Sequence, residues 1–133
     1  MAKPDYPITT AIRQLRDAKI DFVAHQYEYQ EKGGTHQTSL ELSVDEHNVI
    51  KTLIMEDDRS CGLVVLMHGD REVSTKELAR LLGQKKIAPC DQKKAEKLTG
   101  YQFGGTSPFG TKTRMPIYAE ETIFDCARIY ING

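Results

Sequence analysis

The chain has 133 residues, which is the length of one domain and leaves no room for a second. Its 18 Lys and Arg residues nearly balance its 19 Asp and Glu residues, so the formal net charge is −1. This balance excludes a globally basic nucleic-acid binder, and any contact with RNA must use a local patch. No apolar stretch approaches the length of a membrane span, and no signal-peptide hydrophobic region is expected.

The residues that most often hold metals or form disulfides are few and scattered. The cysteines are odd in number and widely spaced, which argues against a disulfide framework and a zinc site: Cys61, Cys90 and Cys126. The histidines show no paired spacing of the metal-binding kind: His25, His36, His47 and His68. We therefore expect no metal and no cofactor, and a reducing cytoplasm as the location.

The first third of the chain begins with a helical pattern. Apolar residues recur at helical spacing and predict a first helix: Ile8, Ala11, Ile12 and Leu15. Residues 22–29 have the pattern of a strand that follows this helix. Residues 31–38 contain Gly33 and Gly34 and predict a loop, after which a short helix is expected near Ser39.

The remaining elements alternate between strands and helices. Residues 49–55 and 63–68 flank a polar stretch and predict an antiparallel hairpin. Ser74 and Glu77 form a capping-box pattern for a helix that Gly83 ends. Asp91 is placed to cap a second helix that ends near Gly100. Two further strands are predicted at residues 116–119 and 127–131, which makes the fold class α+β.

One lysine lies inside the apolar run of residues 49–55. If the run is a strand, Lys51 shares a face with Val49, Leu53 and Met55. Burying an ammonium without a partner costs several kcal/mol, so a fold keeps a cation there only where something meets it. Two interpretations are open: Lys51 reaches water or a protein carboxylate, or it meets an anionic or electron-rich ligand.

A glycine-rich segment, YQFGGTSPFG, occupies residues 101–110. Adjacent Gly104 and Gly105 permit positive φ and the close approach of a ligand, and the amides of Gly105, Thr106 and Ser107 are able to face a common anion. Pro108 stiffens the chain that follows. An ordinary Gly-Pro turn is the alternative interpretation.

Three motifs together resemble a known family. VIKTL around Lys51, GYQFGGTSPFG at 100–110 and IYING at 129–133 are similar to the YbaK/prolyl-tRNA synthetase-associated domain family. That family comprises free-standing aminoacyl-tRNA deacylases, among them the Cys-tRNA(Pro) deacylase type, and the editing insertion of bacterial prolyl-tRNA synthetases. The resemblance covers nearly all of residues 1–133, which we expect to form one editing domain.

The resemblance implies a mixed, mostly antiparallel, curved sheet flanked by helices. The family continues beyond the IYING motif with a second glycine, a basic residue, a strand carrying an acidic residue and a final helix. We expect this C-terminal strand and helix to be missing here, because the sequence ends at Gly133.

The resemblance also implies an activity, which is hydrolysis of the ester that joins a wrong amino acid to the 3′ end of a tRNA. Lys51 would orient the aminoacyl-adenosine and stabilise negative charge. Tyr27 would pack near the adenine or in the core, and Asn132 matches a small polar position. The glycine loop would line the pocket with its residues Gly104, Gly105, Thr106, Ser107 and Pro108.

The attacking group and the partners follow from the same resemblance. Attack would come from water, or from the substrate's own thiol when the amino acid is cysteine. Ser107 lacks a nucleophile elbow, since Phe109 occupies the place of its second glycine. The substrate would be Cys-tRNA(Pro) or another small amino acid on tRNA, bound by its acceptor end, with prolyl-tRNA synthetase as a further partner.

Two other functions stay open, a non-catalytic module that binds tRNA or nucleotides, and a small-ester hydrolase with Ser107 as nucleophile. A cluster of lysines is the local candidate for contact with RNA: Lys85, Lys86, Lys93, Lys94 and Lys97. Lys112 and Arg114 are candidates for further contacts with RNA. His36, in the predicted glycine-containing loop, is expected near the pocket or on the surface.

Overall fold

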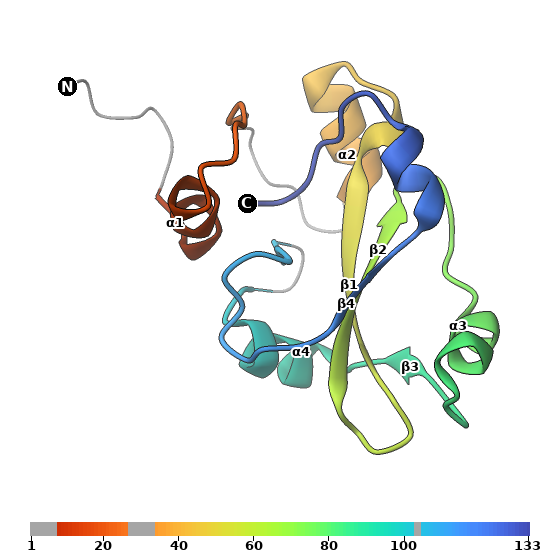
Figure 1. Ribbon diagram of the computed structural model, residues 1–133. Helices are drawn as coiled ribbons and strands as arrows, with labels where there is room; N and C mark the ends of the chain where they lie inside the picture. The colour runs from red at the N-terminus through yellow and green to blue at the C-terminus, as the bar shows by residue number, and fades with distance from the viewer. Residues whose placement is uncertain (1–7, 27–33, 103–104) are drawn as a thin grey trace.

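A four-stranded mixed sheet forms the centre of the computed structural model, which describes residues 8–26, 34–102 and 105–133 (Figure 1). The strand order is β3-β1-β2-β4. β1 runs antiparallel to both β2 and β3, whereas β4 runs parallel to β2. Helices lie around this sheet, so the predicted α+β class with a mixed, mostly antiparallel sheet is confirmed.

The predicted hairpin is the longest paired part of the sheet. β1 (Ile50–Glu56) and β2 (Gly62–His68) pair along their whole length, with Lys51 opposite Met67. β3 (Ala88–Pro89) pairs only with Met55 and Glu56 at the end of β1. β4 (Ile117–Ala119) lies beside β2. Most of the outer edge of β1 is therefore without β3 as a neighbour.

Each face of the sheet packs against one helix. α3 (Thr75–Leu82) covers one face with a cluster of buried residues: Met55, Leu63, Val65, Ala79 and Ile87. α4 (Gln92–Thr99) covers the other face, and its cluster has these members: Ile54, Val64, Ala95 and Met115. Figure 1 shows α3 on one side of the sheet and α4 with α1 on the other. Lys51, Leu53 and Met55 point toward the α3 side, as the strand alternation predicts.

Both predicted helix caps are present. The Ser74 hydroxyl accepts a hydrogen bond from the Glu77 amide at 3.2 Å, and Gly83 ends α3 with a φ of 67°. The Asp91 carboxylate accepts from the Lys94 amide at 2.7 Å, and Gly100 ends α4 with a φ of 79°. These local signals are strong because they satisfy amides that no helical carbonyl reaches.

The strand predicted at residues 22–29 is wrong over its described part. Residues 22–26 follow α1 (Thr10–Asp17) as an irregular segment, and Val23 is exposed. The apolar residues of this segment have the pattern of a strand, but they line a cavity beside β1 instead of pairing in the sheet. The rest of the prediction, including Tyr27, lies outside the described residues.

The loop predicted at residues 31–38 is wrong from Gly34 onward. α2 (Gly34–Leu42) begins there, so the helix expected near Ser39 starts a full turn earlier. The residues that α2 buries are Gln37 and Ser39, which are polar. Apolar periodicity therefore carried no signal for this helix.

The strand predicted at residues 127–131 is reduced to one bridge. Two short 3-10 helices, Glu46–Asn48 and Glu121–Asp125, flank the points where the chain reaches and leaves the sheet. After the second one, Tyr130 forms a parallel bridge with Val49, and the Ile50 amide donates to the Tyr130 carbonyl at 2.8 Å. The C-terminal residues thus lie beside the start of β1. Within the described ranges, no helix has the length and hydrophobicity needed to cross a membrane.

α1 holds the end of the glycine segment in place. The Tyr101 hydroxyl lies 2.8 Å from the Thr10 hydroxyl and donates to the Phe109 carbonyl at 2.5 Å. The Gly110 amide donates to the Gln14 side chain. Gly110 has a φ of +64°, and a Cβ built there would lie 2.9 Å from the Thr10 carbonyl oxygen. The backbones of α1 and the segment are therefore too close for a side chain at Gly110.

We predict that Gly110→Ala destabilises the fold more than Gly83→Ala does. Both glycines have positive φ, so both substitutions carry the left-handed penalty of about 1 to 2 kcal/mol. Only Gly110 adds a clash with a backbone carbonyl, because a Cβ at Gly83 meets nothing within 4 Å. The difference should be about 1 kcal/mol or more in urea unfolding. Equal losses would show that the segment is not packed on α1.

Candidate functional site

A cavity of about 1010 Å³ lies beside the open edge of β1. The pairing of β1 with β3 begins only at Met55, and residues 49–53 line this cavity. The other walls come from α1, residues 20–26, α2, the end of the glycine segment and residues 128–133. A ligand here meets main-chain groups of a strand edge as well as side chains.

Lys51 lines this cavity and is weakly paired within the protein. Its side chain is 18% exposed, and its ammonium lies 3.4 Å from a carboxylate oxygen of Glu72. Glu72 is 95% exposed, so water screens the pair, and such surface pairs contribute about 0 to 1 kcal/mol. The side chain as a whole is thus mostly buried, but its ammonium is held by a partner that it can exchange at little cost.

Thr52 is a cavity residue that the sequence interpretation did not single out. Its hydroxyl oxygen is buried. Among the buried side-chain oxygen and nitrogen atoms of the described residues, it is the one without a hydrogen-bond partner. An unmade hydrogen bond of this kind costs about 1 to 3 kcal/mol. The available signal was its position beside Lys51, as a hydroxyl inside the apolar run of residues 49–55.

The main chain of Thr52 also points toward the cavity. On the outer edge of β1, the Ile50 amide bonds to Tyr130 and the Ile54 carbonyl accepts from the Cys90 amide at 3.0 Å. Residues two apart on a strand direct their N–H and C=O groups to the same edge. The N–H and C=O of Thr52, midway between these two bonds, therefore face the open edge as well.

The glycine segment contributes Thr106 to the cavity wall. Thr106 is buried, and its carbonyl accepts a hydrogen bond from the Asn132 side chain at 3.3 Å. Both residues line the cavity, together with Lys51. The Gly105 amide donates to the Gln102 carbonyl at 3.0 Å, inside the segment itself. Gly104 lies outside the described residues.

Ser107 and Pro108 support the segment from behind. Ser107 is fully buried, and its hydroxyl accepts from the Phe109 amide at 3.2 Å. Pro108 is buried as well, and neither residue is part of the cavity wall. A serine nucleophile must reach the substrate, so this placement argues against the small-ester hydrolase with Ser107 as its nucleophile.

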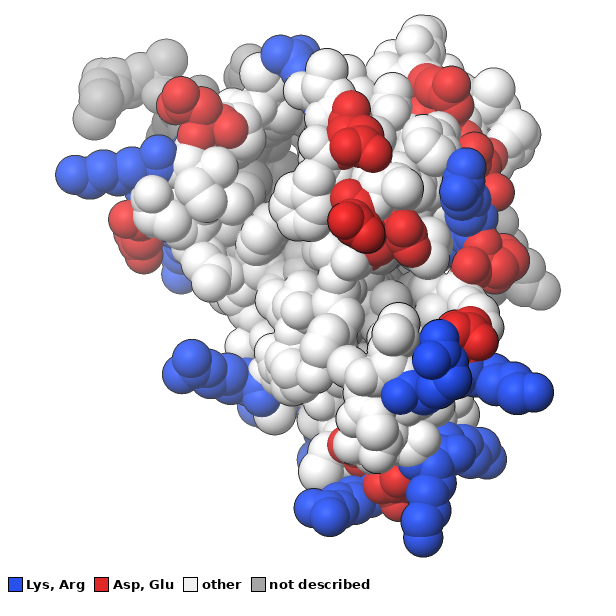
Figure 2. Space-filling model, turned by 45° about the vertical axis from the view of Figure 1, so that its right-hand side comes forward, with Lys and Arg blue, Asp and Glu red and all other residues white. Residues whose placement is uncertain are grey.

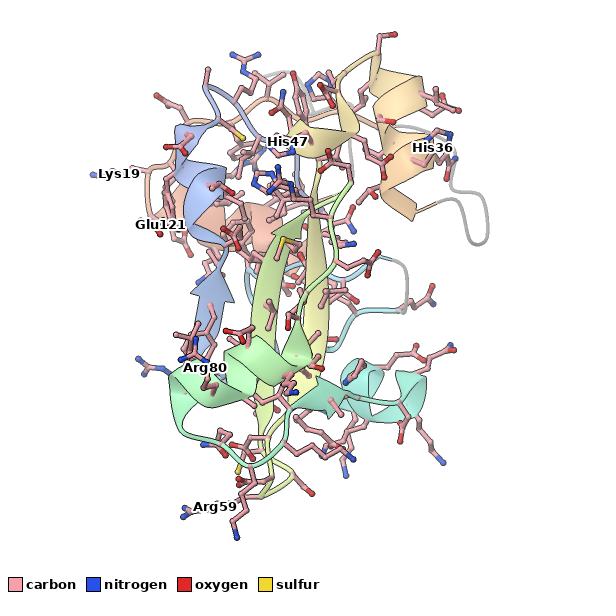
Figure 3. The ribbon with its side chains drawn as sticks, turned by 90° about the vertical axis from the view of Figure 1, so that its right-hand side faces the viewer. Lys19, His36, His47, Arg59, Arg80 and Glu121 are labelled. Atoms are coloured by element: carbon pink, nitrogen blue, oxygen red, sulfur yellow. The ribbon has the colours of Figure 1, made fainter. Side chains whose placement is uncertain are left out.

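The described cavity wall contains no cysteine and no serine. It does contain His25, whose ring lies 5.7 Å from that of Tyr130. His36 was expected in a loop, but it lies on α2 with its side chain mostly exposed and 3.5 Å from Glu46 (Figure 3). The wall thus supplies the Lys51 ammonium, the charged side chains of Asp21 and Arg128, the His25 imidazole, threonine hydroxyls and main-chain groups rather than a thiol or serine nucleophile.

A second polar cluster joins His47, His68 and Cys126, which are far apart in sequence. One donor atom from each lies within 4.8 Å of the others. The two imidazole rings are stacked, with centroids 3.8 Å apart and planes 7° apart. Sequence spacing did not reveal this cluster, because β2 and the two 3-10 helices bring its members together (Figure 3).

Hydrogen bonds within the protein account for this cluster. His68 is fully buried, and its Nδ1–H donates to the His47 carbonyl at 2.7 Å. Its Nε2 lies 2.8 Å from the Thr122 hydroxyl, and His47 Nδ1 lies 3.0 Å from Asp70. Stacked rings hold their in-plane lone pairs in parallel planes, so at least one ring would have to turn for both to bind one ion. The absence of a metal site stays a prediction.

Comparison with known proteins gives the chain its family. The profile of the aminoacyl-tRNA editing domain matches residues 34–133. EbsC of Enterococcus faecalis, named as a candidate Cys-tRNA(Pro)/Cys-tRNA(Cys) deacylase, is 29% identical over 126 residues, which cover 94% of this chain and 77% of EbsC. The proline–tRNA ligase of Brachyspira hyodysenteriae is 29% identical over 92 residues, or 69% of this chain and 16% of that enzyme.

Solved structures share the fold. Hypothetical protein APE2540 superposes with a TM-score of 0.83 at 18% identity, over 94% of this chain and 82% of that one. A candidate trans-editing enzyme for prolyl-tRNA synthetase superposes with a TM-score of 0.64 at 20% identity, over 69% of this chain and 57% of that one. With the profile match over residues 34–133 and the sheet that these structures share, this chain belongs to the aminoacyl-tRNA editing domain family.

Proposed function

We propose that this chain is a trans-editing aminoacyl-tRNA deacylase, which hydrolyses the ester between a small amino acid and the terminal adenosine of a mischarged tRNA. The observation that carries the proposal is the open edge of β1, where Lys51 and Thr52 line one large cavity and the buried Thr52 hydroxyl has no partner among the described residues. Membership of the editing-domain family and the similarity to EbsC support it.

Lys51 is the residue to which we assign substrate orientation and charge stabilisation. Its exposed partner Glu72 gives it up easily, and a bound substrate that excludes water strengthens the attraction between the ammonium and a developing oxyanion. Thr52 presents its N–H and C=O at the same edge, and its buried hydroxyl has no bond to break before it turns toward a ligand. Thr106 and Asn132 also line the cavity, and their hydrogen bond keeps the end of the glycine segment in position.

The attacking group is water, or the substrate's own thiol when the amino acid is cysteine. The absence of cysteine and serine from the described wall favours these over a cysteine or serine nucleophile of the protein. In the water route, oxygen adds to the ester carbonyl, the ester C–O bond breaks, and the ribose hydroxyl regains a proton. The products are the free amino acid and uncharged tRNA.

The cavity of about 1010 Å³ accommodates more than an amino acid, since pockets for drug-sized ligands span about 300 to 1,000 Å³. We propose that it takes the terminal adenosine together with cysteine, alanine or another small amino acid. A pocket distinguishes one methylene by only about 1 to 3 kcal/mol, so contacts with the tRNA or with prolyl-tRNA synthetase would add to selection. The three free cysteines suit a reducing cytoplasm.

We predict that Lys51→Met abolishes most of the activity without unfolding the protein. Methionine keeps the aliphatic stem and removes the charge, so packing against the sheet is preserved. Loss of one good electrostatic donor should lower the rate about 100- to 1,000-fold. The assay is deacylation of a panel of charged tRNAs, beginning with Cys-tRNA(Pro) and Ala-tRNA(Pro).

The matched control is Lys19→Met, which removes an exposed lysine that is not part of the cavity wall. Full activity of the Lys51 variant would contradict the assignment. Binding of these tRNAs without turnover by the unaltered chain would favour the non-catalytic binding module.

We also predict that Thr52→Val lowers the deacylation activity without lowering the stability of the protein. Valine has the same shape, and it removes a hydroxyl that has no partner among the described residues, so the free energy of unfolding should stay equal or rise. Deacylation should fall, because a ligand loses a hydrogen bond worth about 1 kcal/mol or more. Urea unfolding and single-turnover deacylation of the same preparations provide the two readouts. A variant that is less stable but fully active would show that Thr52 serves the fold alone.

A further inference from the structure

One end of the molecule carries exposed cations from four separate segments, which we call the basic end. These segments are the tip of the β1–β2 hairpin, α3, the turn before β3, and α4. The exposed cations of the basic end are Arg59, Lys76, Arg80, Lys85, Lys86, Lys93 and Lys97. Figure 2 shows blue side chains gathered over this end of the molecule, and Figure 3 places Arg59 and Arg80 there.

Specific contacts hold these segments together. The Asp58 carboxylate at the hairpin tip accepts from the Lys85 amide at 2.7 Å. Lys94 reaches the same tip from α4, where its ammonium donates to the Ser60 carbonyl at 2.8 Å and pairs with Glu56. The hydrogen bond to Glu56 raises the pKa of Lys94 above its usual value. Lys94, which the sequence grouped with the RNA-binding lysines, is therefore occupied in joining α4 to the hairpin.

The carboxylates at this end are engaged with backbone amides or with nearby side chains. Asp57 accepts from the amides of Arg59 and Cys61, and Asp91 caps α4. Glu77 pairs with Arg80 at 2.8 Å. In the described part of the chain, six cations of the basic end have no carboxylate within ion-pair distance: Arg59, Lys76, Lys85, Lys86, Lys93 and Lys97.

Acidic residues gather at the opposite end. The exposed or half-buried carboxylates there lie on α2, the two 3-10 helices and the segment after β2: Glu41, Asp45, Glu46, Asp70, Glu72, Glu121 and Asp125. Figure 3 places Glu121 at the end opposite Arg59. The formal net charge of −1 is thus the sum over a molecule whose two ends carry opposite charges. A polyanion would be attracted to one end and repelled by the other.

Building on the proposed function, we propose that the basic end binds the phosphate backbone of the acceptor stem of the tRNA, while the single-stranded 3′ end reaches the cavity. Lys51 and Glu56 are five residues apart on β1, or about 17 Å at the rise of a strand. The basic end begins beside Glu56, where Lys94 attaches α4. A duplex held there directs its unpaired end along β1 toward Lys51, and phosphate contacts fix its register without reading sequence.

The test compares two variants that each lose three positive charges. Lys86→Gln/Lys93→Gln/Lys97→Gln alters the basic end, and Arg13→Gln/Lys19→Gln/Arg71→Gln alters exposed residues elsewhere that do not line the cavity. All six side chains are exposed, so both variants should fold. Binding of uncharged tRNA and of an acceptor-stem minihelix is measured by fluorescence anisotropy from 50 to 300 mM salt.

The basic-end variant should bind both RNAs about tenfold more weakly. The magnitude of the slope of log K against log salt should fall by about 2 to 3, because each lost phosphate contact lowers that magnitude by about 0.9. In deacylation, its KM for charged tRNA should rise while kcat holds. Hydrolysis of an aminoacylated adenosine, which lacks a stem, should be unchanged.

Unchanged affinity and slope in the basic-end variant would contradict the assignment of this surface to tRNA binding. An equal loss of affinity in the matched variant would contradict it as well. Because anisotropy needs no turnover, the result stands even if the chain hydrolyses no ester. Conversely, hydrolysis that is sensitive to Lys51 but unaffected at the basic end would support the deacylase and reject this surface.

Discussion

The site depends on the short pairing between β1 and β3. β3 bonds only to the last two residues of β1, and Tyr130 bonds only at its start, so the main chain around Thr52 is left at an open edge. Strand edges normally pair or are covered, because unpaired N–H and C=O groups are costly when water is excluded. Here the open stretch faces the cavity, where a ligand is able to complete the bonds.

The same edge explains how adjacent residues with opposite orientations serve one site. Lys51 points to the α3 face and Thr52 to the α4 face, since neighbours on a strand alternate. In the middle of a sheet these side chains would be separated by the sheet itself. At an edge both reach the cavity, which places a cation and a hydroxyl on either side of the strand.

The parts of the fold that sequence predicted are those with local causes. The hairpin followed from alternation, and the ends of α3 and α4 from Ser74, Gly83, Asp91 and Gly100, each of which acts through its own backbone neighbours. Lys51 was visible because a cation interrupts an apolar strand. Its placement in a cavity wall agrees with the ligand interpretation, and its contact with Glu72 agrees with the carboxylate interpretation.

The parts that sequence missed depend on distant contacts. α2 buries polar residues, so the sequence has no apolar stripe that predicts this helix. The significance of Thr52 lies in a missing partner, which only three-dimensional packing reveals. The stacking of His47 on His68 and the two charged ends likewise arise when the sheet brings separate segments together.

The most direct test of the account is where an aminoacyl-adenosine binds. A non-hydrolysable analogue, with an amide in place of the ester, is titrated into isotope-labelled protein and followed by backbone amide NMR. The account predicts the largest shifts at Lys51, Thr52 and Thr106, with little change at Lys86 or Lys93. Saturable shifts confined to residues away from the open edge of β1, or no shifts at all, would contradict it.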